Sequence, residues 1–192
     1  MSAESQVKRL DALIRSSGWH MEVLRAAREC ALPDWLIGAG VLRDLVWGEM
    51  HDGFDPALVK DVDVAFFDPT DLTPVRDAAA TAQLVRALPG INWEATNQAA
   101  VHLWYPDWFG DEVAPLVSAA DGVATWPETA TCVGARFLDD DGIEVVAPLG
   151  LDDLLDGVCR RNPRRVTVEQ YRRRLQRKNI AERWPNVRIV DT

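Results

Sequence analysis

A short apolar strand runs directly into a glycine-rich turn and a helix in the first third of the chain. Trp35-Leu36-Ile37 is followed at once by Gly38-Ala39-Gly40, and apolar residues at helical spacing continue from Val41 to Met50. Small residues allow close approach to the backbone, and the free N–H groups at a helix start favour anions. The segment therefore predicts a strand–turn–helix unit suited to a negatively charged ligand.

The next strand carries two acidic residues on one face. Side chains alternate along a strand, so Asp61 and Asp63 point to one side of the run from Asp61 to Phe67, and Val62 and Val64 point to the other. Two carboxylates at this spacing repel each other unless a cation lies between them. Divalent cations such as Mg²⁺ or Mn²⁺ take oxygen ligands. The pattern predicts a metal site at these two aspartates.

Glu94, on an expected strand from Ile91 to Ala95, is the candidate for a third carboxylate. Three carboxylates on neighbouring strands can hold two metal ions, which together activate an attacking oxygen and stabilise the leaving oxygen in phosphoryl transfer. The phosphates would lie against the Gly38–Gly40 turn, and Arg43, in the first turn of the next helix, could donate two N–H groups to one of them.

The remaining patterns predict an α/β (α+β) fold with a mixed sheet flanked by helices, in a single domain over residues 1–192. Loops and short helices are expected over residues 106–130. The other expected elements are two N-terminal helices within residues 1–32, a helix from Pro74 to Leu88, a strand from Val101 to Tyr105, a hairpin of Cys132–Leu138 with Ile143–Ala147, a helix opening at Gly150, and a helix from Val168 to Glu182.

Charge is unevenly distributed along the chain, whose net charge is −9. Eleven basic and two acidic residues lie between Arg160 and Arg188, so residues 160–192 form a basic C-terminal helix and tail. Such a segment can attract phosphates or nucleic acid, or it can be a solvated helix docked on the protein's own acidic surface. Because Arg172, Arg173 and Arg174 cover three directions around a helix, at least one of them must face solvent or a partner.

Composition indicates a cytoplasmic protein without a membrane partner. No stretch approaches the roughly 18 consecutive apolar residues of a membrane span, and the N-terminal segment lacks the apolar core of a secretion signal. Three cysteines without a CxxC spacing make a poor disulfide framework and are expected to be reduced.

The run IGAGVLRDLVWG followed by KDVDVAFFD resembles the DNA polymerase β-like nucleotidyltransferase superfamily, and within it the CCA-adding enzymes, whose glycine turn leads into a V-R-D helix and a D-x-D strand. The segments NWEATNQAAVHLWY, WPETATCVGARF, APLGLDDLL and KNIAERWP resemble a bacterial nucleotidyltransferase-like family of unassigned substrate. The resemblance implies that Asp61, Asp63 and Glu94 are catalytic metal ligands. Ala39 replaces one glycine of the usual pair, and the loop before Asp61 is longer than in the CCA-adding enzymes.

Two functions follow as hypotheses. The first is a Mg²⁺-dependent nucleotidyltransferase that moves an NMP group from a nucleoside triphosphate to an acceptor hydroxyl of an RNA, a protein or a small molecule. The second is a nucleotide-binding sensor of the same fold with weak or no turnover. A dinucleotide-binding fold is disfavoured, since Arg43 occupies the third glycine position of the G-x-G-x-x-G fingerprint.

Several other residues have two interpretations each. His102, on the expected strand, is a substrate contact or base, or a hydrogen-bonded structural residue. Asn97 and Gln98 position a base or ribose, or they satisfy backbone groups at a turn. Asp152 and Asp153 cap a helix or bind metal. One aromatic set stacks on a nucleobase or packs in the core: Trp104, Trp108 and Trp126.

Overall fold

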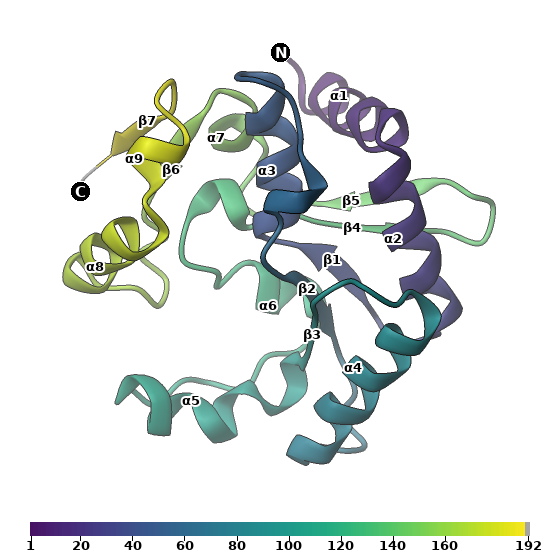
Figure 1. Ribbon diagram of the computed structural model, residues 1–192. Coiled ribbons are helices and arrows are strands. Elements are labelled where there is room, and N and C mark those ends of the chain that lie inside the picture. Colours follow the sequence, from purple (N-terminus) through teal and green to yellow (C-terminus); the bar gives the residue numbers. More distant parts are fainter. Residues whose placement is uncertain (191–192) are drawn as a thin grey trace.

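The computed structural model describes residues 1–190, in which a five-stranded mixed sheet is flanked by helices (Figure 1). The strand order is β3-β2-β1-β4-β5; β2 and β3 are parallel, and the other neighbours are antiparallel. This arrangement confirms the predicted α/β fold with a mixed sheet. The strands are β1 (Leu36–Gly38), β2 (Val62–Phe66), β3 (Trp93–Asn97), β4 (Gly134–Phe137) and β5 (Ile143–Val146).

Alternation along the strands sorts side chains between two apolar layers. Val62 and Val64 of β2 belong to the main core, which the N-terminal helices cover. Leu36 of β1 and Ala65 of β2 point to the other face, where they pack against α6 (Ala119–Val123). Each fully buried aliphatic side chain stabilises the fold by about 1.5–3 kcal/mol. Four helices from the first half of the chain contribute to the main core: α1 (Ala3–Ser16), α2 (Gly18–Glu29), α3 (Gly40–Glu49) and α4 (Pro74–Ala87).

The elements α8, α9, β6 and β7 lie together on the left of Figure 1, away from α1, α2 and α4. Here β6 and β7 form a separate parallel pair, which the sequence patterns did not predict. The C-terminal elements are α7 (Asp152–Leu155), β6 (Val158–Arg160), α8 (Val168–Lys178), α9 (Ile180–Arg183) and β7 (Arg188–Val190). The 3₁₀ helices within residues 1–190 are η1 (Pro56–Leu58), η2 (Gln98–Ala100) and η3 (Thr129–Thr131).

Two predicted elements are wrong in type or extent. The expected strand from Val101 to Tyr105 is the first part of helix α5 (Val101–Phe109). Alternating apolar residues resemble a strand, but η2 already turns the chain into a helical path before Val101. The expected helix from Val168 to Glu182 is divided into α8 and α9 because Asn179 adopts a left-handed conformation, with φ of 51°.

The hairpin of β4 and β5 and the helix α4 confirm their predictions within a few residues.

All three cysteines are buried and none forms a disulfide. No helix within residues 1–190 is both long enough and apolar enough to cross a membrane.

Candidate functional site

Three residues predicted for the site form a row across adjacent strands. Gly38 of β1 pairs with Asp63 of β2, and Asp63 pairs with Glu94 of β3. Directly paired residues on neighbouring strands project from the same face, so the carboxylates of Asp63 and Glu94 lie side by side. Asp61 lies one residue before β2 begins and close enough to raise the pKa of Asp63. The sheet register therefore places Asp63 beside Glu94, while Asp61 lies just outside the paired segment.

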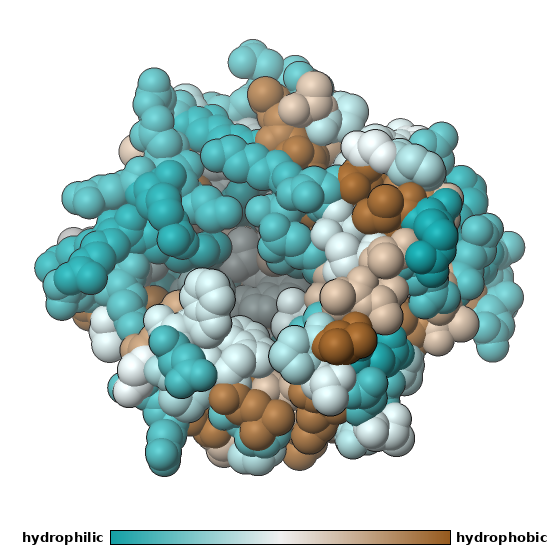
Figure 2. Space-filling model, turned by 60° about the horizontal axis from the view of Figure 1, so that its bottom comes forward, coloured by the Kyte–Doolittle hydropathy of each residue, from teal (hydrophilic) through white to brown (hydrophobic). Residues whose placement is uncertain are grey.

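A pocket of about 440 Å³ opens beside this row, and Asp63 and Glu94 form its acidic wall. Figure 2 shows this face of the molecule hollowed, with hydrophilic side chains gathered along part of the rim. Two further walls come from α5 and α8, which lie far apart in the sequence. The remaining lining residues are Val64, Ala65, Thr96, Gln98, Val101, Trp104, Tyr105, Phe109, Thr125, Trp126, Pro127, Arg165, Val166, Gln170, Arg173, Arg174 and Arg177.

The acidic wall carries negative charge that no ion pair neutralises among residues 1–190, although Lys178 and Arg174 offset part of it at Asp63. Burial, together with the negative charges of Asp61 and Glu94, raises the pKa of Asp63 to about 6. Within residues 1–190 none of these three carboxylates accepts a hydrogen bond or forms an ion pair. A cation would relieve this repulsion.

The donor set fits a hard divalent cation, although the carboxylates do not form a complete cage. No group of three His, Cys, Asp or Glu side chains among the described residues converges into a metal-binding cluster. Mg²⁺ commonly takes one or two carboxylates and fills its other positions with water and substrate phosphates. An open pair such as Asp63 and Glu94, with Asp61 nearby, suits an ion that arrives with its substrate.

The wall from α8 is basic, and none of its residues was predicted for the site. Gln170, Arg173, Arg174 and Arg177 recur at intervals of three and four residues, which places them on one face of the helix. This spacing and the excess of basic residues are visible in the sequence, but they do not show which part of the protein the helix faces. Arg174 is anchored from behind by the buried carboxylate of Glu128.

The wall from α5 is aromatic. Trp104, Tyr105 and Phe109 line the pocket from this helix, and the Tyr105 and Phe109 ring centroids are 4.5 Å apart. The Arg165 guanidinium lies over the Tyr105 ring at 5.2 Å from its centroid. Trp126 lines the pocket from the loop after α6. Such rings provide flat apolar surfaces of the kind on which nucleobases stack.

Arg43 does not reach this pocket. Its side chain is buried, and its Nε and Nη2 donate to the Asp44 carboxylate at 2.9 and 2.6 Å. The other oxygen of Asp44 accepts from Arg183 Nη2 at 2.7 Å, so one buried carboxylate joins α3 to α9. In this arrangement Arg43 holds the fold together, and its contact with phosphate stays a prediction.

The glycine turn beside Arg43 is strained and covered. Ala39 has φ of 55° and ψ of −121°, a conformation that glycine adopts far more readily. A side chain at Gly38 would meet the Val133 carbonyl at 2.4 Å and the Trp126 ring at 2.7 Å. The missing side chain therefore lets Trp126 pack over the turn, next to the pocket, and Gly40 begins α3.

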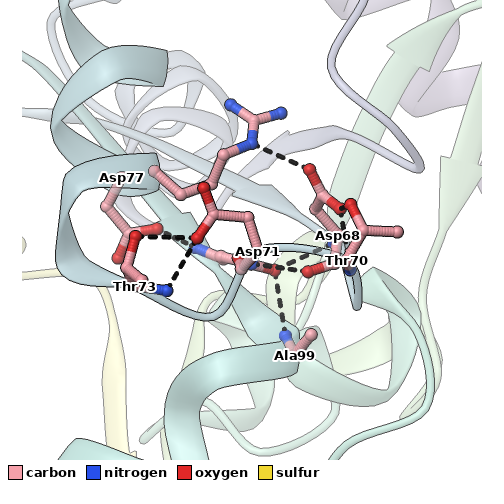
Figure 3. A network of polar contacts seen from close by, with 8 residues as sticks. Asp68, Thr70, Asp71, Thr73, Asp77 and Ala99 are labelled. Carbon is pink, nitrogen blue, oxygen red and sulfur yellow. Dashed lines mark hydrogen bonds and ion pairs between the residues drawn. The ribbon is translucent and has the colours of Figure 1, made fainter.

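Asn97 satisfies backbone groups at a turn, which is the structural one of its two predicted roles. Its side-chain Nδ2 donates to the carbonyls of Asp68 and Asp71 at 2.8 and 2.9 Å, and its Oδ1 accepts from the N–H groups of Asp68 and Ala99. Its own N–H donates to Asp77. Figure 3 shows Asp68 and Asp71 of the loop before α4, Asp77 of α4 and Ala99 of η2 in one network of polar contacts. Gln98, by contrast, lines the pocket.

The other ambiguous residues are also placed. His102 lies on α5 outside the pocket lining, and its buried Nδ1 has no hydrogen-bond partner within residues 1–190. Asp152 and Asp153 lie in the first turn of α7, where they bind Gln6 and Arg160. Trp104 and Trp126 line the pocket, but the Trp108 side chain is 78% exposed.

The mixed sheet, the glycine turn and the paired carboxylates define a nucleotidyltransferase fold of the polymerase β type. A nucleotidyltransferase family model matches residues 25–189, and the chain belongs to that family. This membership supports nucleotidyl transfer as the reaction class.

Two solved structures are similar to this chain. One is an NMR structure described as revealing a CCA-adding enzyme head domain; it is 29% identical, covers 96% of each chain and has a TM-score of 0.80. The other, a tRNA-processing enzyme in an apo form, is 20% identical with a TM-score of 0.53, and the match covers 88% of this chain and 42% of that one. It shares the fold. Among curated proteins, none matches this chain.

Proposed function

We propose that this protein transfers an NMP group from a nucleoside triphosphate to an acceptor hydroxyl, in a reaction that depends on Mg²⁺ or Mn²⁺. The observation that carries the proposal is the register of β2 and β3, which sets Asp63 beside Glu94 in the wall of a pocket that also has aromatic and basic walls. The three walls match the three parts of a metal–nucleotide complex: the cation, the base and the phosphates.

In the proposed reaction the acceptor oxygen attacks the α-phosphorus and forms a new P–O bond. The bond from the α-phosphorus to the bridging oxygen breaks, and pyrophosphate leaves with its electron pair. A divalent cation held by Asp61, Asp63 and Glu94 would supply charge neutralisation at the α-phosphate.

The protein's own residues have separate tasks. Asp61 and Asp63 hold the cation side of the substrate, and Glu94, the most exposed of the three, takes the proton of the acceptor hydroxyl. Trp104 and Trp126 enclose the base and keep water away from it. Preorganised charges of this kind act without rearrangement during the reaction.

The proposal is tested by label transfer. The protein is incubated with each α-labelled nucleoside triphosphate, a cell extract as the source of acceptor, and Mg²⁺ or Mn²⁺. We expect label to enter an acceptor, and we expect Asp61→Asn combined with Asp63→Asn to lower the rate by at least about 10²-fold. The matched control is Asp139→Asn combined with Asp156→Asn, which neutralises two exposed carboxylates outside the pocket.

The outcomes separate the two hypotheses. Transfer that the site variant loses and the control variant keeps supports the enzyme. Tight nucleotide binding without transfer in any extract would instead identify a sensor and overturn the proposal.

A further inference from the structure

The pocket-facing side of α8 concentrates positive charge on one helix face. Arg173 and Arg177 are one turn apart, and Arg174 lies beside them. Like charges at three- and four-residue spacing destabilise a helix unless counter-charges offset them. The identity of those counter-charges shows which of the arginines are available to a ligand.

Of these three arginines, Arg174 alone has a buried counter-charge among residues 1–190. Its guanidinium is bound by Glu128, which is 2% exposed. Arg173 pairs with Glu169, but both side chains are about three-quarters exposed, so water competes for this pair and a ligand can replace it. Arg177 forms no hydrogen bond or ion pair with any residue in the range 1–190. Two of the three arginines can therefore turn toward an anion.

Acidic and basic walls remain separate across the pocket. Arg174 and Lys178 are near enough to Asp63 to lower its pKa, yet neither forms an ion pair with it. A ligand that carries a cation at one end and phosphates at the other would satisfy both walls at once.

We propose that α8 binds the triphosphate, with Arg173 and Arg177 as its ligands, in place of the glycine turn and Arg43. The inference rests on the proposed function for the identity of the ligand as a nucleotide. Arg43 is already bound to buried Asp44, whereas the α8 arginines line the pocket. Arginine also suits phosphate because its planar N–H groups donate two bonds at once.

The test measures binding of inorganic tripolyphosphate by calorimetry, without divalent cations and at fixed salt concentration. We expect Arg173→Gln and Arg177→Gln each to weaken binding about tenfold. Both residues are exposed, so the variants should fold normally, which a melting curve checks. The matched control is Arg172→Gln, which removes the same charge from the same helix at a position outside the pocket lining; we expect a change below about twofold.

A second probe addresses the glycine turn without disturbing buried Arg43. Gly40→Ala adds a methyl group whose nearest neighbour is Arg43 Nη2 at 3.8 Å, so the turn keeps its shape but loses close access to its backbone. We expect tripolyphosphate affinity to stay within about twofold of wild type. A tenfold loss in this variant, with none in the α8 variants, would overturn the inference and assign the phosphates to the turn.

The remaining outcomes also support or overturn the assignment of the phosphates to α8. An equal loss in the Arg172, Arg173 and Arg177 variants would indicate diffuse charge attraction and overturn the inference. The proposed function fails separately, through absence of label transfer, so tripolyphosphate binding that depends on Arg173 and Arg177 would support the α8 site even then.

Discussion

At the scale of single residues, Asp63 shows how the geometry of the proposed site opposes stability. The pKa of its carboxyl is raised to about 6 by burial and by its acidic neighbours, so the folded state resists its ionisation. Well below pH 3.8 the carboxyl is protonated in both the folded and the unfolded state, so it does not change the free energy of unfolding. As the pH rises from 3.8 to about 6, the unfolded state ionises first, and the free energy of unfolding falls. We predict that Asp63→Asn raises the free energy of unfolding by about 2–3 kcal/mol at pH 7 without metal. Mg²⁺ with nucleotide should shrink the difference, and chemical denaturation measures both values.

Ala39 is a second residue whose position costs stability. Its φ of 55° is a backbone conformation that is strained for alanine, because the methyl group crowds the backbone, and that glycine adopts without this strain. We predict that Ala39→Gly stabilises the protein by about 1 kcal/mol, since relief of strain outweighs the greater unfolded-state freedom of glycine. Ala57→Gly is the control, because exposed Ala57 has no positive φ and should lose stability on the same change. Equal effects at both positions would contradict the prediction.

His20 links stability to pH. The Val41 carbonyl can only accept, so Nε2 donates to it at 3.2 Å, and the Ser17 hydroxyl donates to Nδ1 at 2.7 Å. This neutral form is buried, and burial lowers the pKa of His20 from 6.5 to about 4. The unfolded state therefore binds a proton first as pH falls. We predict a loss of about 3 kcal/mol in the free energy of unfolding between pH 6.5 and pH 4, with none above pH 7 from this residue. His20→Gln should flatten that part of the profile.

At the scale of elements, Asn97 joins the end of β3 to the loop before α4. Asn97→Asp keeps the shape but replaces the two N–H donors with a buried negative charge facing the Asp68 and Asp71 carbonyls. We predict a loss of about 2–4 kcal/mol in unfolding free energy. Asn92→Asp makes the same chemical change at an exposed residue with one hydrogen bond, and it should cost under about 1 kcal/mol.

The elements that the sequence predicted well are those whose pattern is local. The strand–turn–helix at Gly38 and the acidic strand at Asp61 could be predicted because strand alternation and glycine turns depend only on residues that are adjacent in sequence. Helix α5 was mistaken for a strand because its direction is set by η2, where Asn97 Oδ1 accepts from the Ala99 N–H. The break at Asn179 depends on a single left-handed residue, which composition does not specify.

At the scale of the whole molecule, the pocket joins segments more than a hundred residues apart in sequence. Asp63 lies on β2 and Arg177 on α8, and their meeting depends on contacts such as Arg174 with Glu128 and Arg183 with Asp44. The acids could be grouped from sequence because the order of glycine turn, D-x-D strand and Glu94 strand resembles that of the nucleotidyltransferase superfamily. The basic wall could not, since its charge pattern fits a solvated helix equally well.

The most direct measurement is an electron paramagnetic resonance titration of Mn²⁺ in the presence of a nucleoside triphosphate. The free-ion signal reports binding to the protein directly. We predict that wild-type protein removes more of this signal than nucleotide alone, and that Asp61→Asn combined with Asp63→Asn abolishes the difference. Unchanged Mn²⁺ uptake by that double variant would contradict a metal–nucleotide site at these carboxylates.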